Sequence, residues 1–162
     1  MQRQERISDL ARRERARRQL PMLLTKIGDA LNVPFCESDV LPWEMSRGLR
    51  VEIQKRVSLS LQRPHKDHLV LPPADRDRFN EEFRKRAQKF GPENVVLSLG
   101  GFADLPLVQV QASLVASRFY ELWKVGDTVV ICSADLSCGV LADWYPDDPV
   151  QAFEIAGWGE LA

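Results

Sequence analysis

The segment ADRDRFNEEFRKRAQKFG (74–91) constrains the fold of this chain more than any other part of the sequence. Phe79, Phe83 and Ala87 recur at four-residue steps, so they share one face of a predicted helix. A glycine ends the pattern, and the apolar run ENVVLSL (93–99) that follows is typical of a buried strand. An amphipathic helix that leads into a buried strand requires a fold in which helices cover a sheet.

Similar patterns predict most of the remaining elements. Pro106 can open a helix that runs to Lys124 and carries a broad apolar face. Four further strands are predicted at 68–71, 128–133, 139–145 and 152–159. Together these elements predict an α+β fold, in which N-terminal helices precede a mixed, largely antiparallel sheet packed against two amphipathic helices.

The segment LRVEIQKRVSLSLQ (49–62) fits two kinds of secondary structure. Its apolar residues fall on odd positions and its polar residues on even ones, which is the period of a strand. The subset Leu49, Ile53, Val57 and Leu61 also fits one face of a helix. The β-branched content favours a strand or hairpin, so we predict a strand here.

The N-terminal region is predicted to form two helices. Residues 3–20 have helical propensity, but their apolar stripe is short and arginines crowd the following turns. Pro21 suits the first position of a second helix, because a proline there loses no helical hydrogen bond. We therefore expect a basic helical arm over residues 1–20 and a single α+β domain over residues 21–162.

Charge is divided unevenly along the chain. Residues 1–90 hold 20 Lys or Arg against 13 Asp or Glu, whereas residues 91–162 hold 2 against 10. Such segregation indicates surfaces that meet charged partners. Alternatively, the two halves neutralise each other within one fold or across a homodimer.

The composition argues for a globular protein of the cytoplasm. Hydrophobic residues make up 44% and charged residues 28%, and no apolar run approaches the twenty residues of a membrane span, so no membrane partner is expected. The N-terminus lacks the apolar segment of a secretory signal, and three cysteines suggest no disulfide framework. Motifs for nucleotide binding are also missing, so we expect no cofactor.

The segment VVICSADLSCGVLADWYPDD (129–148) is the main candidate for a binding site. Its acidic and aromatic side chains resemble in composition an interface that captures a basic protein, and the chain has no Lys or Arg after Lys124. The predicted partner-binding residues are Asp135, Asp143, Trp144, Tyr145, Asp147 and Asp148. The same aspartates also suit ordinary turns, which is the simpler alternative.

The leading hypothesis is therefore a non-catalytic protein-binding module whose acidic C-terminal face captures a basic partner. Bacterial immunity proteins that neutralise nuclease toxins are similar to it in charge and size, and complementary charge speeds such encounters. This is an analogy of physical character, and no sequence motif accompanies it.

Two other function classes stay open. A nucleic-acid-associated regulator or accessory subunit would use the basic arm, through Arg12, Arg13, Arg15, Arg17 and Arg18. A small enzyme would use a site built from Cys138 and Asp135, but no base or cation accompanies them in the sequence. The segment HKDH (65–68) contains types of metal ligand but sits between prolines, so we interpret it as an exposed turn and predict no metal site.

Overall fold

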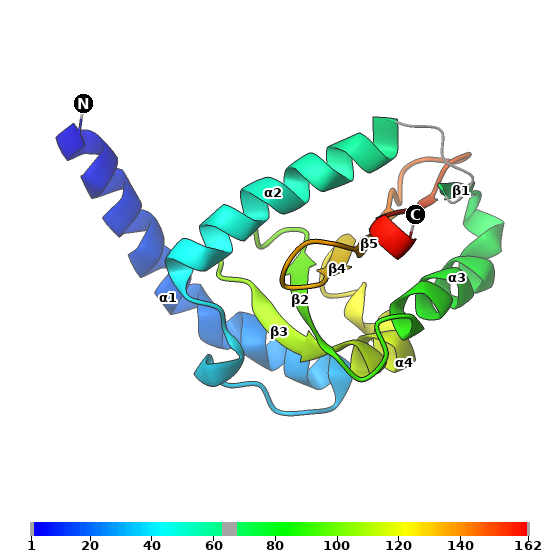
Figure 1. The fold of residues 1–162 in the computed structure, drawn as a ribbon, viewed down its shortest axis with the longest axis horizontal. Coiled ribbons are helices and arrows are strands. Elements are labelled where there is room, and N and C mark those ends of the chain that lie inside the picture. Colours follow the sequence, from blue (N-terminus) through cyan, green and yellow to red (C-terminus); the bar gives the residue numbers. More distant parts are fainter. Residues whose placement is uncertain (1, 63–67, 162) are drawn as a thin grey trace.

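The computed structural model describes residues 2–62 and 68–161, which fold into helices on both sides of one sheet (Figure 1). Within these residues the α-helices are α1 (Gln2–Leu31), α2 (Trp43–Gln62), α3 (Arg76–Gln88) and α4 (Ala112–Leu122). The strands are β1 (Leu69–Leu71), β2 (Asn94–Leu99), β3 (Val108–Gln111), β4 (Thr128–Cys132), β5 (Gly139–Trp144) and β6 (Phe153–Trp158). Short 3₁₀ helices occur at η1 (Glu37–Asp39), η2 (Pro73–Asp75) and η3 (Gly159–Leu161).

The six strands lie in the order β1-β6-β5-β4-β2-β3, and every neighbouring pair is antiparallel. The predicted α+β fold is therefore confirmed, although the sheet has no parallel pair among the described strands and so is not mixed. Consecutive strands β4, β5 and β6 are neighbours, as is expected when short connections join antiparallel strands. None of the helices described is both long and apolar enough to cross a membrane.

The two faces of the sheet are covered unequally. On one face, side chains such as Val129 and Ile131 pack in a large core with α1, α3 and α4. On the other face, Val130 and Leu141 form a smaller core with Ile53 of α2. Residues alternate between these cores along each strand, which follows from the two-residue period of a strand. Figure 1 shows α2 alone on its side of the sheet, with α3 and α4 grouped on the other.

The segment 49–62 is helical, and the prediction of a strand there is wrong. It forms the larger part of α2, and Leu49, Ile53 and Val57 pack together against the sheet. The other apolar residues of the alternating pattern, Val51 and Leu59, are 52% and 50% exposed. The packing of these residues against the sheet therefore outweighed the preference of β-branched residues for strands, which is weak.

The predicted helix break at Pro21 is also wrong, because α1 continues through this proline. A proline inside a helix removes one hydrogen bond and crowds the preceding turn. Ala16 before it and Leu23 and Ile27 after it are all buried in the same core, so packing on both sides holds the helix together. The division of the chain into an arm and a domain at residue 20 stays a prediction.

Residues 106–124 begin as a strand instead of a helix. Val108 and Val110 are buried and pair with β2 within β3, and α4 starts only at Ala112. The prediction of a helix start at Pro106 is therefore wrong. The remaining predicted elements, one helix and five strands, are present close to their expected positions as α3, β1, β2, β4, β5 and β6.

Candidate protein-binding site

Strand β5 separates the predicted partner-binding residues into two groups. Asp135 lies in the turn before β5, whereas Asp143 and Trp144 end this strand and Tyr145 follows it. The four steps from Gly139 to Asp143 alone span about 13 Å of extended chain. The structure therefore brings five of the six residues to one end of the sheet and leaves Asp135 at the other.

Asp135 is committed to the turn that carries it. Its carboxylate accepts a hydrogen bond of 2.9 Å from the backbone N–H of Ser137. Hydrogen bonds from the Ser133 and Ser137 side chains and from this backbone N–H lower the pKa of Asp135 to about 2. This side chain is exposed, so it stays ionised at neutral pH while it also organises the turn.

Asp143, Tyr145 and Glu154 form a hydrogen-bonded cluster at the opposite end of β5. The Tyr145 hydroxyl lies 2.9 Å from Asp143 Oδ2 and 2.9 Å from Glu154 Oε2. Asp143 Oδ1 accepts bonds from the Thr128 hydroxyl and the Trp144 backbone N–H. Burial, together with the two carboxylates, raises the pKa of Tyr145, so this phenol keeps its proton at neutral pH.

Glu154 is a member of this cluster that the sequence analysis missed. It lies directly opposite Asp143 in the pairing of β5 with β6, which places both carboxylates on one face of the sheet. Its Oε1 lies 2.7 Å from His68 Nε2, just before β1. In the sequence, Glu154 is recognisable only as an acidic residue at an alternating position of the last predicted strand. Its contact with Asp143 depends on the strand register, which the sequence does not specify.

A small cavity opens beside this cluster, and we call it the Tyr145 cavity. It has a volume of about 200 Å³ and is lined by Val70, Tyr145, Asp148, Gln151 and Glu154. Two carboxylates and an aromatic ring therefore face one space, with no Lys or Arg among the lining residues that the structure describes. Tyr145 is 41% exposed, so the cavity communicates with solvent.

The loop after β5 supplies one wall of this cavity. Asp148 accepts hydrogen bonds of 2.8 Å from the backbone N–H groups of Val150 and Gln151. These bonds lower the pKa of Asp148, which therefore stays ionised. Asp147 is exposed beside it. Trp144 points to the other face of the sheet, where its ring packs 4.8 Å from Trp123, and so lies apart from the cavity.

The predicted nucleic-acid-binding arginines lie along α1 and differ in their partners. Arg13 forms ion pairs with Asp9 and with Glu44 of α2. Arg12, Arg15, Arg17 and Arg18 are exposed and form no ion pair among the described residues. The middle of α1 is thus joined to α2 through acidic side chains, and part of the positive charge of the helix is used within the fold.

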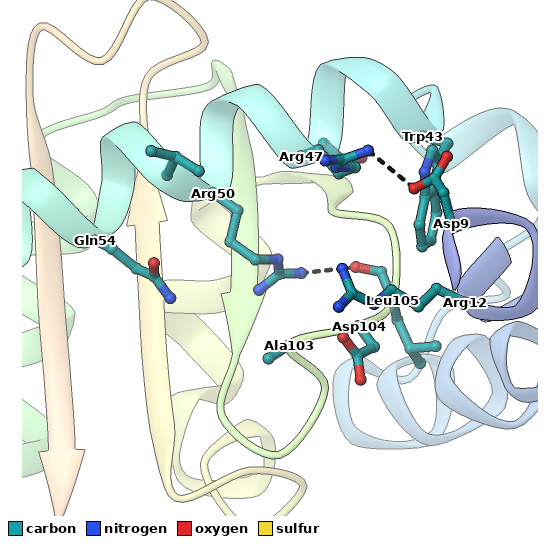
Figure 2. Close-up of a pocket in the computed structure, with 11 residues that line it drawn as sticks. Asp9, Arg12, Trp43, Arg47, Arg50, Gln54, Ala103, Asp104 and Leu105 are labelled. Atoms are coloured by element: carbon teal, nitrogen blue, oxygen red, sulfur yellow. Dashed lines mark hydrogen bonds and ion pairs between the residues drawn. The ribbon is translucent and has the colours of Figure 1, made fainter. Parts of the chain in front are cut away.

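A second cavity of opposite character lies between α1, α2 and the loop after β2, and we call it the Arg50 cavity (Figure 2). It has a volume of about 160 Å³. Arg50 is held by Ser98 Oγ at 3.0 Å and the Leu105 backbone oxygen at 2.7 Å. Burial lowers the pKa of the Arg50 guanidinium, an effect that the charge of Asp104 opposes. The sequence analysis assigned no role to this residue.

The two residues of the enzyme alternative, Cys138 and Asp135, lie in the same turn between β4 and β5, next to Cys132 at the end of β4. Cys132 is fully buried, and this burial, with smaller contributions from Cys138 and Asp135, raises the pKa of its thiol to about 12. Cys138 is half-buried at the β4–β5 turn. In the described parts of the chain no group of three His, Cys, Asp or Glu residues is arranged to hold a metal. His65 and Asp67 lie outside the described residues.

No family model matches the sequence, and neither curated proteins nor solved structures provide a match.

Proposed function

We propose that this chain is a non-catalytic binding protein that captures a basic protein partner through the Tyr145 cavity and the aspartates of the adjoining loop. The observation that carries the proposal is the lining of this cavity, where Asp148 and Glu154 face a common space with no Lys or Arg among its described residues, and Glu154 contacts only His68 through its other oxygen. Two carboxylates beside an aromatic ring favour a ligand that brings positive charge.

The hydrogen-bond balance of the cluster supports the same conclusion. A hydroxyl carries one proton, so Tyr145 can donate to Asp143 or to Glu154 but not to both at once. Thr128, the Trp144 backbone N–H and His68 already contact Asp143 Oδ1 and Glu154 Oε1, so the shortage is confined to the two oxygens that share the Tyr145 proton, one of which is left without a donor. A lysine ammonium or an arginine guanidinium would supply the missing donor.

The shape of the Tyr145 cavity suits a long basic side chain. Val70 and the ring of Tyr145 offer apolar surface for the aliphatic stem, and the carboxylates take the charged head. A cation over a tyrosine ring gains a further attraction. The exposed Asp147 and Asp148 beside the cavity would accelerate encounter with a basic surface.

A toxin-neutralising immunity protein of the bacterial cytoplasm is the specific version of this proposal. A nuclease presents a basic channel to its substrate, and an acidic binding protein would occupy that channel in place of nucleic acid. The absence of Lys and Arg after Lys124 keeps the C-terminal surface free of repulsion toward such a partner.

The test is affinity capture from a lysate of the native host with the tagged full-length chain. We expect a basic protein to bind the wild type and to be lost from the double variant Asp148→Asn/Glu154→Gln, which keeps the size of both side chains. The matched control, Asp77→Asn/Glu81→Gln, removes the same charge from exposed positions of α3. Equal capture by all three proteins would remove the Tyr145 cavity from the binding site.

The second candidate is a nucleic-acid-binding role for α1, favoured by the exposed and unpaired Arg15, Arg17 and Arg18 among the described residues. Deleting the first 19 residues would remove Ala16 from the core, so substitution is the better test. Replacement of these three arginines by glutamine should flatten the salt dependence of a mobility shift. An unchanged salt slope would exclude this role for α1.

A further inference from the structure

The Arg50 cavity holds a fixed, half-buried cation that forms no ion pair among the described residues. Ser98 Oγ and the backbone oxygens of Leu105 and Phe102, the last at 3.5 Å, hold the Arg50 guanidinium in place, and all three acceptors are neutral. Asp104 acts on it only at longer range and forms no ion pair with it. A partly desolvated guanidinium is normally paired with an anion, because burial without one is unfavourable. Its remaining N–H groups are therefore available to a ligand.

A second guanidinium faces the same space. Figure 2 shows Arg12 of α1 and Arg50 of α2 directed toward one another across the cavity. Arg12 also has no ion pair in the described part of the chain, and two cations that face each other repel unless an anion lies between them. Arg47, the third arginine of the lining, is engaged by Asp9 at 2.9 Å.

The charges of the lining select the kind of anion. Arg12, Arg47 and Arg50 contribute three positive charges, and Asp9 and Asp104 contribute two negative charges. The net charge of the cavity is thus one positive charge, which a single carboxylate would balance and a phosphate dianion would exceed. The small volume of about 160 Å³ also suits a carboxylate on a short stem. Leu105, Val51 and Ala103 provide apolar contacts for that stem.

We infer that the Arg50 cavity is a carboxylate-binding site, in which Arg12 and Arg50 together hold an acidic side chain of the captured partner protein. The site itself follows from the cavity, and only the source of the carboxylate rests on the proposed function. The partner would then carry an acidic residue near the basic side chain that enters the Tyr145 cavity.

A groove along α2 runs from the Arg50 cavity toward Asp143, which accepts a hydrogen bond from Tyr145. This neighbouring cavity of about 500 Å³ shares Arg50, Gln54 and Ala103 with the Arg50 cavity and extends to Thr128 and Asp143. Its centre is apolar, with Val57, Leu61, Val130 and Leu141 among its lining residues. A segment of the partner can therefore lie along α2 with its acidic side chain at Arg50 and its basic side chain toward Asp143.

The test uses nuclear magnetic resonance of the arginine Nε–H groups in the free, full-length protein. The probe is N-acetyl-glutamate α-amide, and the neutral control is its glutamine analogue. We expect the Arg50 signal, assigned by its loss in Arg50→Lys, to shift saturably with the carboxylate in the millimolar range, roughly −4 kcal/mol for 1 mM. Inorganic phosphate should bind more weakly. No saturable shift, or tighter binding of phosphate, would overturn the inference.

Variants of α1 test the second guanidinium. Arg12→Ala should weaken carboxylate binding roughly 5-fold, the effect of losing one partly exposed charged hydrogen bond. Arg17→Ala is the matched control, because Arg17 is exposed on the same helix and does not line the cavity. Equal binding by the two variants would contradict the role of Arg12.

The source of the carboxylate is tested with the captured protein. Arg12→Glu should weaken its binding, whereas Arg17→Glu should have a much smaller effect. If the free probe binds but both variants hold the partner equally, the carboxylate does not come from the partner. Because the probe experiment needs no partner, failure of the Arg50 site and failure of protein capture are seen separately.

Discussion

The two faces of the sheet differ in how completely helices cover them. The face under α1, α3 and α4 is filled by a continuous core, in which Phe83 stacks on Phe119 with ring centroids 3.8 Å apart. Of the described helices, α2 alone covers the opposite face. Both the Arg50 cavity and the groove that runs from it toward Asp143 lie along that helix. A single helix cannot cover a six-stranded sheet, so charged side chains can line the surface that remains.

This difference suggests that stability resides mainly on the three-helix face and recognition on the α2 face. Glu154 of the Tyr145 cavity shares its side of the sheet with Ala156 and Trp158, which pack in the smaller core under α2. Both charged cavities are thus associated with the less covered side. Substitutions on the two faces test this comparison.

Truncation of Phe83 should have the largest effect on stability. Phe83→Ala removes a fully buried ring and should lower the free energy of unfolding by about 3–5 kcal/mol. On the α2 face, Val57 is only partly buried, so Val57→Ala should cost about 1 kcal/mol. Urea unfolding of both variants measures the difference. Similar losses would show that the two faces contribute equally.

Two glycines of the α2 side should respond in opposite directions. A Cβ at Gly139 would lie 2.1 Å from the Trp158 ring, which is fixed by its hydrogen bond to the Leu136 backbone oxygen. Gly139→Ala should therefore destabilise the protein by about 1–3 kcal/mol. Gly48, inside α2, has nothing within 4 Å of its added Cβ.

Gly48→Ala should accordingly stabilise the protein by about 0.5–1 kcal/mol, because alanine loses less backbone entropy in a helix. Thermal unfolding of the two variants provides the comparison. A destabilised Gly48→Ala would indicate that α2 packs more closely than its exposure implies.

Removal of the shared hydroxyl should have a smaller effect. Tyr145→Phe leaves Asp143 and Glu154 facing each other without the proton between them. We expect a loss of about 1 kcal/mol at pH 7, measured by urea unfolding. A variant as stable as the wild type at pH 7 would mean that the cluster does not need this donor.

The smallest effect is expected for Asp135, which is exposed. Its folded-state pKa of about 2 lies below the ordinary value of 3.8, so its contribution is present above pH 3.8 and is lost as the pH falls toward 2. The stability difference between wild type and Asp135→Asn should therefore fade over this interval. A difference that stays constant from pH 5 to pH 2 would contradict the assigned hydrogen bonds.

The sequence predicted the fold best where one pattern excluded the others. The faces of α3 and the strands β4 to β6 were expected because their apolar periods and turn residues agree. The prediction for segment 49–62 failed because its apolar residues fit the period of a strand and that of a helix. Only packing against the sheet selects the helix. The prediction of a helix break at Pro21 failed because the burial of Ala16 and Leu23 outweighs the local effect of this proline.

The candidate site was predicted only as a stretch of sequence. Tyr145 and Asp148 line one cavity, but Glu154 and Val70 join them through strand pairings that connect residues far apart in the chain. Asp135 was grouped with them because it is close in sequence, whereas an extended strand separates them in space. The Arg50 cavity requires α1, α2 and the loop after β2 to meet, which no local pattern specifies.

We propose that charge at the Tyr145 cavity drives capture of a basic protein. The most direct test is the association rate of the captured partner, measured by stopped flow at low and high ionic strength. We expect the rate to fall by roughly tenfold between 50 and 500 mM salt for the wild type, and to be lower and less salt-dependent for Asp148→Asn/Glu154→Gln. An association rate that neither salt nor these substitutions change would contradict the account.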